Sequence, residues 1–347
     1  MRQTLEAVRN ACGQVIPIWY SRKLSDDEVR SLFLETIAGV AEFGSISDLV
    51  AVSDGDERGA AVIEEIRRAQ EAEQGQSFSI LSLPENRGKG AAVREGMRFL
   101  LARPHIRYLA IRDNDGDHSM HDLIGIVRGV MHAAADSGNP LVMGIGRRSD
   151  VHRPLGYARG QFEELVCRMT LDMIQWHAAR TGRAVPLQYC SIHGEWIDLH
   201  SGFKVFTRES AEAVFRADPP SCGLAGNARD RHAVEVVLTV ENHLAGGIVA
   251  EIRRNTYNEQ PTTTFGEFNR AEMSANMLAW PAIRLEIPAE VVEQFFWNRV
   301  HRLTIPTIVP DGKAECEAIL KAALVKLGIP SDATIGRAAA WPGPRFL

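Results

Sequence analysis

The chain has 347 residues, of which 45% are hydrophobic and 24% are charged, a balance typical of a globular protein with one large or two smaller domains. Its formal net charge of -5 argues against a nucleic-acid partner whose phosphates the protein would have to neutralise. No secretory signal and no apolar run long enough for a membrane span are visible. Five scattered cysteines without a CxxC pair favour reduced thiols. We therefore expect a soluble, cytoplasmic protein without an integral membrane segment.

Strand-like and helix-like segments alternate through the first half of the chain. Apolar runs of strand length predict strands at residues 14–21, 47–56, 77–83, 108–115 and 140–146. Apolar residues at helical spacing predict helices at residues 27–43, 59–74, 90–102 and 120–138. This alternation predicts an α/β fold with a mostly parallel sheet flanked by helices. Ligands in such sheets bind beyond the carboxyl ends of the strands.

The second half is less regular. The pattern predicts a long helix at 162–181, a strand-like segment around a turn at 195–208, a helix at 232–246 and a strand at 247–257. From about Ala271 onward, helix-like runs are broken by Pro281, Pro288, Pro306 and Pro310. We therefore expect one α/β domain over residues 1–258 and a mostly helical C-terminal extension over residues 259–347.

Polar turns with chemical potential follow the second and third expected strands. Asp54 comes directly after the second strand, where a carboxylate can accept hydrogen bonds from a base or a ribose. The stretch "SLPENRGKGAAVREGM" (82–97) then places Lys89 between Gly88 and Gly90, directly before a helix. Such glycines let the backbone approach a phosphate, and the helix N-terminus and the lysine add positive charge. Ordinary Asp-Gly and Gly-rich turns are the structural alternatives.

A third polar turn, "YLAIRDNDGDHSMHDL" (108–123), places Asp113, Asp115 and Asp117 at the end of an apolar strand. Carboxylates this close repel one another, and each is costly to bury without a partner. Mg²⁺ and Mn²⁺ prefer oxygen ligands, and Mg²⁺ typically binds one or two protein carboxylates plus substrate phosphates. A solvated turn explains one or two of the acids better than all three. The cluster therefore predicts a site for Mg²⁺ or Mn²⁺.

The order of these motifs resembles the GT-A glycosyltransferases, specifically family 2 enzymes of the dolichol-phosphate mannosyltransferase type. "VIPIWY" resembles the family's VIPxYNE start, "VAVSDGDE" its VVVDDGST, and "NRGKGAAVREGM" its N-x-G-K-G-x-A-x-x-x-G. "DNDGDHSMHDL" resembles D-A-D-x-Q-H-x-P-E-x-I, and "DLHSGFKVFTRES" (198–210) resembles D-x-x-[CS]-G-F-[RK]-x-F-x-R. The match covers about residues 14–257. It implies a GT-A fold with a nucleotide-sugar half at about 14–150 and an acceptor half at about 151–258.

The resemblance implies a nucleotide-sugar site for a UDP- or GDP-linked donor. The residues that it places around the nucleoside, the ribose and the phosphates are Pro17, Asp54, Asn86, Lys89, Gly90, Asp113 and Asn114. Asp113, Asp115 and Asp117 would hold the divalent cation on the diphosphate, where the cation stabilises the leaving group as a Lewis acid. Asp115, the second acid of the D-x-D pattern, is the residue on which we expect catalysis to depend most.

Departures from the family pattern favour a small soluble acceptor over a membrane lipid. In enzymes that glycosylate a polyprenyl phosphate an Arg/Ser pattern follows the fifth strand, whereas Glu163 aligns with the serine here. An acid facing a lipid phosphate is unfavourable. "RHAVEVVL" and "NEQPTTTF" are faintly similar to glucosyl-3-phosphoglycerate synthases, whose acceptor is a small phosphorylated acid. The candidate acceptor-binding residues are Arg147, Arg148, Arg159, His193, His200 and Ser201.

An inverting transfer to a hydroxyl group needs a general base, for which Asp230 and Glu235 are the candidates. A polyprenyl-phosphate glycosyltransferase and a non-catalytic nucleotide-sugar-binding protein remain alternatives. A nucleotidyltransferase is a third, although "PIWYSRKLSDD" lacks a Gly-rich loop after the first strand. His193 and His200, with the acids near them, also leave a structural zinc site open. The donor sugar, the stereochemistry and the oligomeric state, a homo-oligomer included, are not determined by the sequence.

Overall fold

The computed structural model describes residues 2–149, 156–190, 196–226, 228–254 and 269–332. The elements up to the fifth strand are α1 (Arg2–Ala11), β1 (Cys12–Ile18), α2 (Asp26–Ile37), α3 (Val40–Phe43), a 3₁₀ turn (Ile46–Asp48), β2 (Leu49–Asp54), α4 (Glu57–Gln74), β3 (Ser79–Leu83), α5 (Lys89–Leu101), β4 (Tyr108–Ile111), α6 (Met120–Ser137) and β5 (Val142–Arg147). The elements that follow are α8 (Tyr157–Arg180), β6 (Lys204–Thr207), α9 (Arg208–Phe215), a π-helical turn (Ala228–His232), α10 (Val234–Leu244), β7 (Ile248–Arg253), α11 (Arg270–Arg284), α12 (Ala289–Val300), α13 (Ile305–Ile308) and α14 (Gly312–Lys326).

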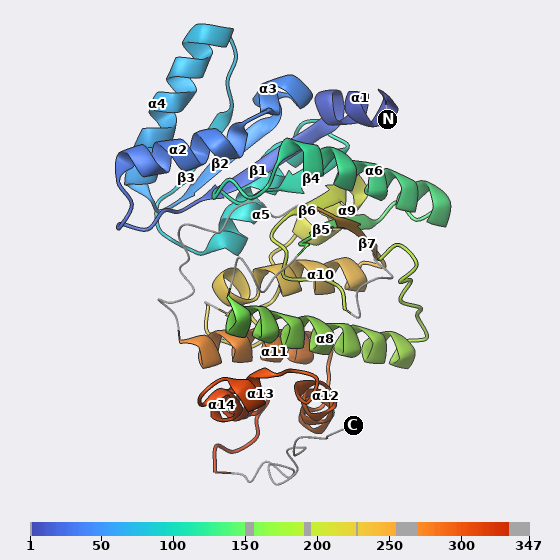
Figure 1. Ribbon diagram of the computed structural model, residues 1–347. Helices are drawn as coiled ribbons and strands as arrows, with labels where there is room; N and C mark the ends of the chain where they lie inside the picture. The colour runs from blue at the N-terminus through green and yellow to red at the C-terminus, as the bar shows by residue number, and fades with distance from the viewer. Residues whose placement is uncertain (1, 150–155, 191–195, 227, 255–268, 333–347) are drawn as a thin grey trace.

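A seven-stranded sheet with the order β3-β2-β1-β4-β6-β5-β7 lies between layers of helices (Figure 1). All neighbouring strands run parallel except β6, which is antiparallel to both β4 and β5. From β1 the chain adds β2 and then β3 on one side, and it returns to add β4 on the other side of β1. The carboxyl ends of β1 and β4 therefore form a topological switch point, the place where open α/β sheets bind their ligands.

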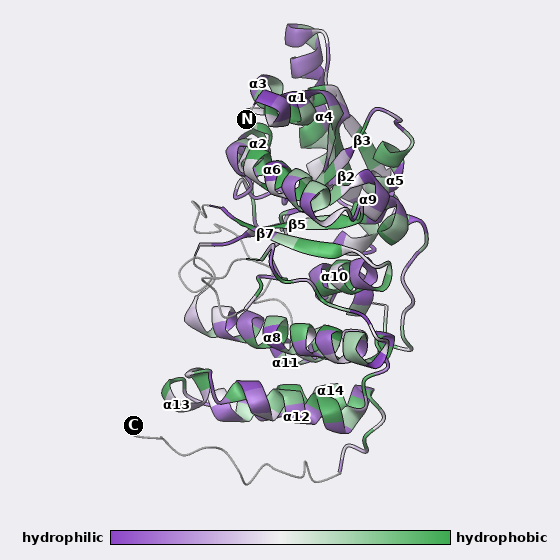
Figure 2. Ribbon diagram, turned by 90° about the vertical axis from the view of Figure 1, so that its right-hand side faces the viewer, coloured by the Kyte–Doolittle hydropathy of each residue, from purple (hydrophilic) through white to green (hydrophobic). Residues whose placement is uncertain are grey.

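Apolar side chains cover both faces of the sheet. Residues of α1, α2, α4 and α6 form one core with one face, and residues of α5, α9 and α10 form a second core with the other. A third core joins α8 and α10 to α11, α12, α13 and α14. Because α10 contributes to the second and the third core, it connects the sheet to the helical layers beyond it. These layers lie one below the other in Figure 2.

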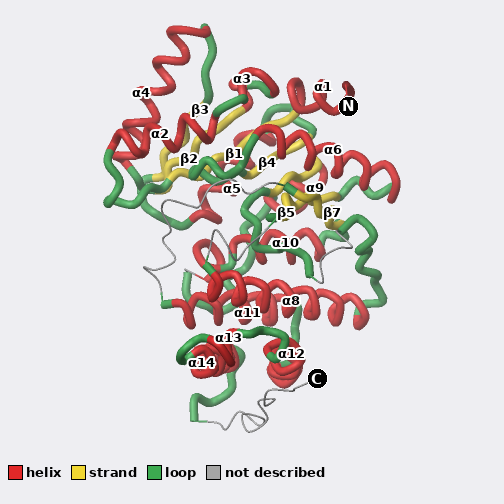
Figure 3. The backbone as a smooth tube through the Cα atoms, viewed as in Figure 1, coloured by secondary structure: helices red, strands yellow, loops and turns green. Residues whose placement is uncertain are grey.

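The predicted α/β architecture with a mostly parallel sheet is confirmed. The five strands predicted in the first half all form, and the described chain beyond β7 consists of helices and loops (Figure 3). The prediction of a single helix over 27–43 is wrong, because the chain turns at Gly39, whose φ is +75°. Pro281 does not break a helix either, since α11 continues through it to Arg284. No described helix is both long and apolar enough to cross a lipid bilayer.

Candidate functional site

Two loops meet at the switch point between β1 and β4. Trp19 and Tyr20 follow β1, and the loop 113–119 follows β4. The Tyr20 hydroxyl donates a hydrogen bond to the Asn114 carbonyl oxygen at 3.2 Å, and the Asn114 amide donates to the Trp19 carbonyl oxygen at 3.4 Å. Trp19 keeps 39% of its surface exposed. This edge of the sheet therefore combines a partly exposed indole with the predicted acidic turn.

Arg112, the last residue before the acidic turn, fixes the shape of that turn. It is fully buried, and its guanidinium donates to Gln14 Oε1 at 2.7 Å and to the Thr36 carbonyl oxygen at 2.5 Å. It also donates twice to the carbonyl oxygen of His118. Burial lowers the pKa of Arg112 to about 10, which still leaves it charged at neutral pH. The acidic turn is thus built around a buried cation.

His118 holds the acidic turn in place from its buried side. Its Nδ1 accepts a hydrogen bond from the backbone N–H of Asp113 at 2.8 Å, and its ring stacks on Phe203 with centroids 4.6 Å apart. Burial, reinforced by nearby cations such as Arg254, keeps the His118 pKa well below its usual value, so the ring is neutral. A neutral ring that accepts at Nδ1 carries its proton on Nε2. The acidic turn and the segment 201–203 are packed together through this contact.

Lys89, Asp113 and Glu235 form one ion-pair cluster. The Lys89 ammonium lies 2.7 Å from Asp113 Oδ1 and 2.8 Å from Glu235 Oε1. Lys89 is the first residue of α5, Asp113 follows β4, and Glu235 lies in the first turn of α10. Burial opposes the charge of Lys89, but the two carboxylates outweigh it and raise the lysine pKa. Residues of three separate segments that the sequence analysis assigned to one site do come together.

The other two acids of the turn differ in their surroundings. Burial, with smaller contributions from the charges of Asp113 and Asp117, raises the Asp115 pKa to about 6. Asp117 is 5% exposed, and its Oδ2 accepts from both terminal nitrogens of Arg254 at 3.0 Å. Its Oδ1 is buried without a hydrogen bond. Burial raises the Asp117 pKa even though Arg254 acts in the opposite direction.

Asp113 and Asp115 fit a divalent cation better than Asp117 does. Their carboxylates are close enough for Asp113 to raise the Asp115 pKa, which is the mutual repulsion that a cation relieves. Within the described residues, no group of three or more His, Cys, Asp and Glu side chains is arranged to hold a metal ion by itself. Two carboxylates suffice where substrate phosphates complete the coordination. Asp117 as a third ligand stays a prediction, since Arg254 already engages it.

The turn with the predicted phosphate-binding glycines is held by Asp54. Both carboxylate oxygens of this residue accept backbone hydrogen bonds, from the N–H of Arg87 and the N–H of Gly88, each at 2.7 Å. A Cβ atom on Gly88 would lie 2.5 Å from the Asp230 carbonyl oxygen, and one on Gly90 would lie 3.0 Å from Asp230 Cα. These glycines are therefore required by the close approach of the π-helical turn. Their contact with a phosphate, like that of Asp54 with a nucleoside, stays a prediction.

Three further predicted residues line or support this region. Pro17 is buried in β1, opposite Val52 of β2. The Asn86 carbonyl oxygen accepts from Arg231, whereas the Asn86 side-chain oxygen is buried without a hydrogen bond. Asp230 is ion-paired with Arg94 Nη1 and with Arg229 Nη2, each at 2.6 Å. Arginines engage both carboxylate oxygens of Asp230, whereas Glu235 lies beside Asp113 through Lys89, so Glu235 is the better placed of the two predicted bases.

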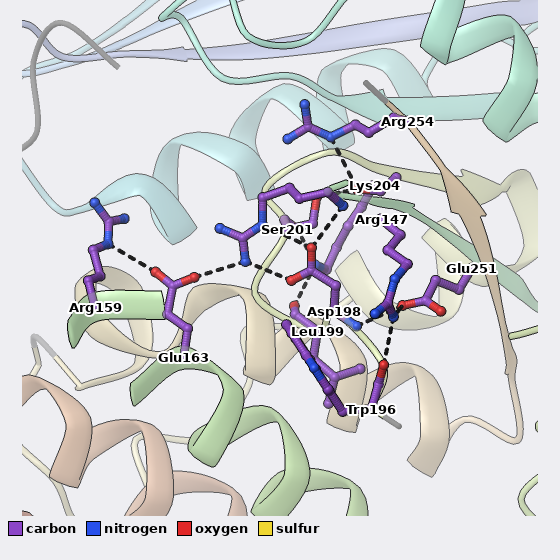
Figure 4. A network of polar contacts seen from close by, with 12 residues as sticks. Arg147, Arg159, Glu163, Trp196, Asp198, Leu199, Ser201, Lys204, Glu251 and Arg254 are labelled. Carbon is purple, nitrogen blue, oxygen red and sulfur yellow. Dashed lines mark hydrogen bonds and ion pairs between the residues drawn. The ribbon is translucent and has the colours of Figure 1, made fainter. Parts of the chain in front are cut away.

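The predicted acceptor arginines belong to a network of buried ion pairs (Figure 4). Arg148 binds Asp198 through Nη2 at 2.6 Å and through Nε at 2.9 Å, and its Nη2 also lies 2.8 Å from Glu163. Arg159 contacts the other oxygen of Glu163 at 3.0 Å. Arg147 contacts Glu251 Oε1 at 2.8 Å. Each of the three arginines therefore has a carboxylate partner, and the charges of these three arginines and three carboxylates cancel.

The remaining predicted acceptor residues lie beside this network, except for His193, which falls outside the described residues. Ser201 is fully buried, and its hydroxyl donates to the Gly146 carbonyl oxygen at 2.6 Å. His200 is 9% exposed, and its Nε2 is buried without a hydrogen bond. Burial, although opposed by the charges of Glu163 and Glu235, lowers the His200 pKa. His200 is thus the predicted acceptor residue with a polar atom still available near Glu235.

No protein-family model matches the chain, and no curated protein is significantly similar to it. The resemblance to GT-A glycosyltransferases therefore rests on the sequence motifs quoted above.

Sequence analysis missed several residues that shape the site. Trp19 could have been found, because an aromatic residue near the carboxyl end of an expected strand is a candidate ligand contact. Lys204 is fully buried and donates to the carbonyl oxygens of Leu199 at 2.9 Å and Ser201 at 2.6 Å, which holds the turn before it. Arg254 follows β7, far from Asp117 in sequence, and no sequence signal pairs them.

Replacing Gly202 with alanine should weaken ligand binding at the acidic turn without unfolding the protein. A Cβ atom there would lie 2.3 Å from Asp113 Oδ2 and 3.0 Å from Lys89 Nζ, so the Asp113 carboxylate would have to move. We expect binding of a nucleoside diphosphate with Mn²⁺ to fall by about tenfold or more, since small displacements of a positioned group are costly. Gly125→Ala in α6 is the control, because nothing lies within 4 Å of its Cβ position. Equal affinities for both variants and the parent would contradict the placement of the site.

Proposed function

We propose that the protein is a glycosyltransferase with a GT-A fold that uses Mg²⁺ or Mn²⁺ to move a sugar from a UDP- or GDP-linked donor to a small acceptor. The observation that carries the proposal is the meeting of Lys89, Asp113 and Glu235 beside the switch point of the sheet. The mostly parallel sheet flanked by helices agrees with the fold that the motif resemblance implies. The partly exposed indole of Trp19, at the same edge of the sheet, adds a surface on which a base or a sugar can stack.

In this proposal Asp113 and Asp115 would hold the cation, which would supply Lewis-acid stabilisation to the leaving nucleoside diphosphate. Lys89 supplies a further positive charge beside the phosphates, at the N-terminus of α5. Asp54 keeps the turn before Lys89 in shape through the two backbone N–H groups that it accepts. Arg112 and His118 fix the acidic turn from below.

Glu235 is the base that we assign to an inverting reaction. Burial raises its pKa, but Lys89 and Lys204 outweigh this effect and lower it. A carboxylate in that state is a poor base, and it becomes a better one when Lys89 turns to the diphosphate. His200 lies near Glu235 and has a buried Nε2 without a hydrogen bond, so it is positioned to contact the acceptor hydroxyl group.

The acceptor site that we propose is suited to a small hydroxylated compound. Arg147, Arg148 and Arg159 all have carboxylate partners, so an anionic group on the acceptor would have to displace one of these carboxylates. A polyprenyl-phosphate acceptor is disfavoured for the same reason, because its phosphate would meet a neutral network that contains Glu163.

Calorimetry with UDP and GDP, in Mn²⁺ and in excess chelator, tests the proposal directly. We expect at least one of the two nucleotides to bind about tenfold or more tightly with Mn²⁺, since the phosphates and the two carboxylates then share the cation. Incubation of the corresponding nucleotide sugars with a panel of small hydroxylated acceptors should then release the nucleoside diphosphate. Equal binding with and without chelator would exclude the metal role. Binding without turnover on any acceptor would favour a non-catalytic nucleotide-sugar-binding protein.

A further inference from the structure

The Lys89 ammonium is ion-paired with the Asp113 carboxylate, which the proposed cation also needs. It lies 2.7 Å from Asp113 Oδ1, an atom that is buried and has no hydrogen bond besides this ion pair. The backbone of Gly202 approaches the other oxygen so closely that a Cβ atom there would lie 2.3 Å from Asp113 Oδ2. Asp113 is therefore enclosed on one side by backbone and neutralised on the other by an ammonium. A cation that binds Asp113 must compete with Lys89.

We propose that Lys89 is a specificity-determining residue, which holds the place of the cation on Asp113 and transfers to the diphosphate when cation and nucleotide bind together. This inference rests on the proposed function. A free divalent cation has to displace Lys89 and leaves the ammonium without its Asp113 partner. A diphosphate offers the ammonium new oxygen partners, so the displacement is compensated. The site would thereby select the cation–diphosphate pair over the free cation.

The geometry of Lys89 suits such an exchange. Its side chain is 29% exposed, against 23% for Asp113 and 17% for Glu235, so Lys89 is the most exposed member of the cluster. Lysine is a mobile point charge on a four-carbon stem, so it can change partners without moving the backbone. Its position as the first residue of α5 places it where helix N-termini attract phosphates. Glu235, the other carboxylate partner of the ammonium, loses it in the same exchange.

The size of the effect follows from the charges. An opposite charge within about 4–6 Å changes the proton affinity of a carboxylate by about 1–3 pKa units, that is, by a factor of about ten to a thousand. Removing the ammonium should therefore raise the affinity of the carboxylates for a cation by at least about tenfold. The same change removes a partner of the phosphates and should weaken binding of the nucleotide. Mn²⁺ should then increase the affinity for the nucleotide by a smaller factor than in the parent. By linkage, the nucleotide should increase the affinity for Mn²⁺ by that same smaller factor.

The test compares Lys89→Gln with the parent in three titrations: Mn²⁺ alone, a nucleoside diphosphate in chelator, and the nucleotide at saturating Mn²⁺. Mn²⁺ alone is followed by electron paramagnetic resonance of the free ion, which needs no activity. We expect Mn²⁺ alone to bind about tenfold or more tightly to Lys89→Gln, and the nucleotide with Mn²⁺ to bind about tenfold or more weakly. Lys321→Gln is the matched control, because it removes the same charge from an exposed position on α14.

Tighter binding of Mn²⁺ together with weaker binding of the nucleotide distinguishes the exchange of partners from a structural role of Lys89. A lysine that only holds the loop in shape would weaken both ligands when it is replaced, and this result would overturn the inference. Unchanged Mn²⁺ affinity would overturn it as well, while binding of nucleotide and Mn²⁺ by the parent would leave the proposed function standing. A parent that binds no nucleoside diphosphate at any Mn²⁺ concentration would overturn both. If Lys89→Gln does not fold, Lys89→Met, which keeps the length of the stem, gives the same readings.

Discussion

Replacing Asp115 with asparagine is expected to slow sugar transfer by about a hundred- to a thousandfold while the protein remains folded. The asparagine keeps the shape of the side chain and the oxygen that accepts from the Asp117 N–H at 3.2 Å, so the turn should persist. It removes one carboxylate from the pair that we assign to the cation, and with it part of the stabilisation of the leaving group. The measurement is the initial rate of transfer at saturating Mn²⁺.

The melting temperature without metal gives the second reading for the same variant. Burial, with the charges of Asp113 and Asp117, raises the Asp115 pKa to about 6, so ionisation of Asp115 at neutral pH lowers the stability of the folded protein relative to the unfolded chain. Asp115→Asn should therefore melt at the parent temperature or above it. Asp27→Asn, an exposed acid in the first turn of α2, is the control for loss of charge alone. Transfer at the parent rate by Asp115→Asn would contradict the assignment of the acidic turn.

The fold could be predicted from the sequence where the chain is periodic. The strands of the first half are short apolar runs that end in polar turns, and each was found within a few residues. The antiparallel direction of β6 could not be predicted. Its sequence, "KVFT", is too short to show a direction, and its partners β4 and β5 are set by topology. The prediction that Pro281 breaks a helix was wrong for a similar reason, because tertiary packing decides the outcome there. Trp280, beside the proline, is fully buried among residues of the third core, and this packing outweighs the hydrogen bond that the proline cannot donate.

The residues of the candidate site could be predicted where they belong to a sequence motif. They could not be predicted where their role depends on a partner that is distant in sequence. Lys89, Asp113 and Glu235 were singled out from their motifs, and the structure brings them into contact. The partners of the arginines were not foreseen, because Asp198 and Glu251 are far from Arg147 and Arg148 in sequence. Spacing reveals neighbours within one element, whereas an ion pair between elements depends on how the sheet is ordered.

This distinction matters most for Arg148, which the sequence analysis assigned to the acceptor. Its guanidinium is buried between Asp198 and Glu163, whose side chains are 1% and 10% exposed. Burial alone would raise the Asp198 pKa, yet Arg148 lowers it to about 2. The pair therefore stabilises the fold above the unfolded pKa of about 4, and this contribution is lost as the pH falls through about 2. Arg148 is thus expected to act first as a support of the acceptor side of the site.

Arg148→Met should accordingly lower the free energy of unfolding by about 3–5 kcal/mol at neutral pH, because it leaves the buried carboxylates of Asp198 and Glu163 without their cation. Urea titration measures this loss, and the difference from the parent should shrink as the pH falls to about 2, because burial without Arg148 lets Asp198 take up its proton at a higher pH in the variant than in the parent. Arg159→Met is the matched control. The Arg159 side chain is 21% exposed and Glu163 keeps Arg148, so its loss should be below about 1 kcal/mol. If Arg148→Met keeps the parent stability and only raises the KM for the acceptor, the arginine binds the acceptor and the buried network is not what holds this half of the site together.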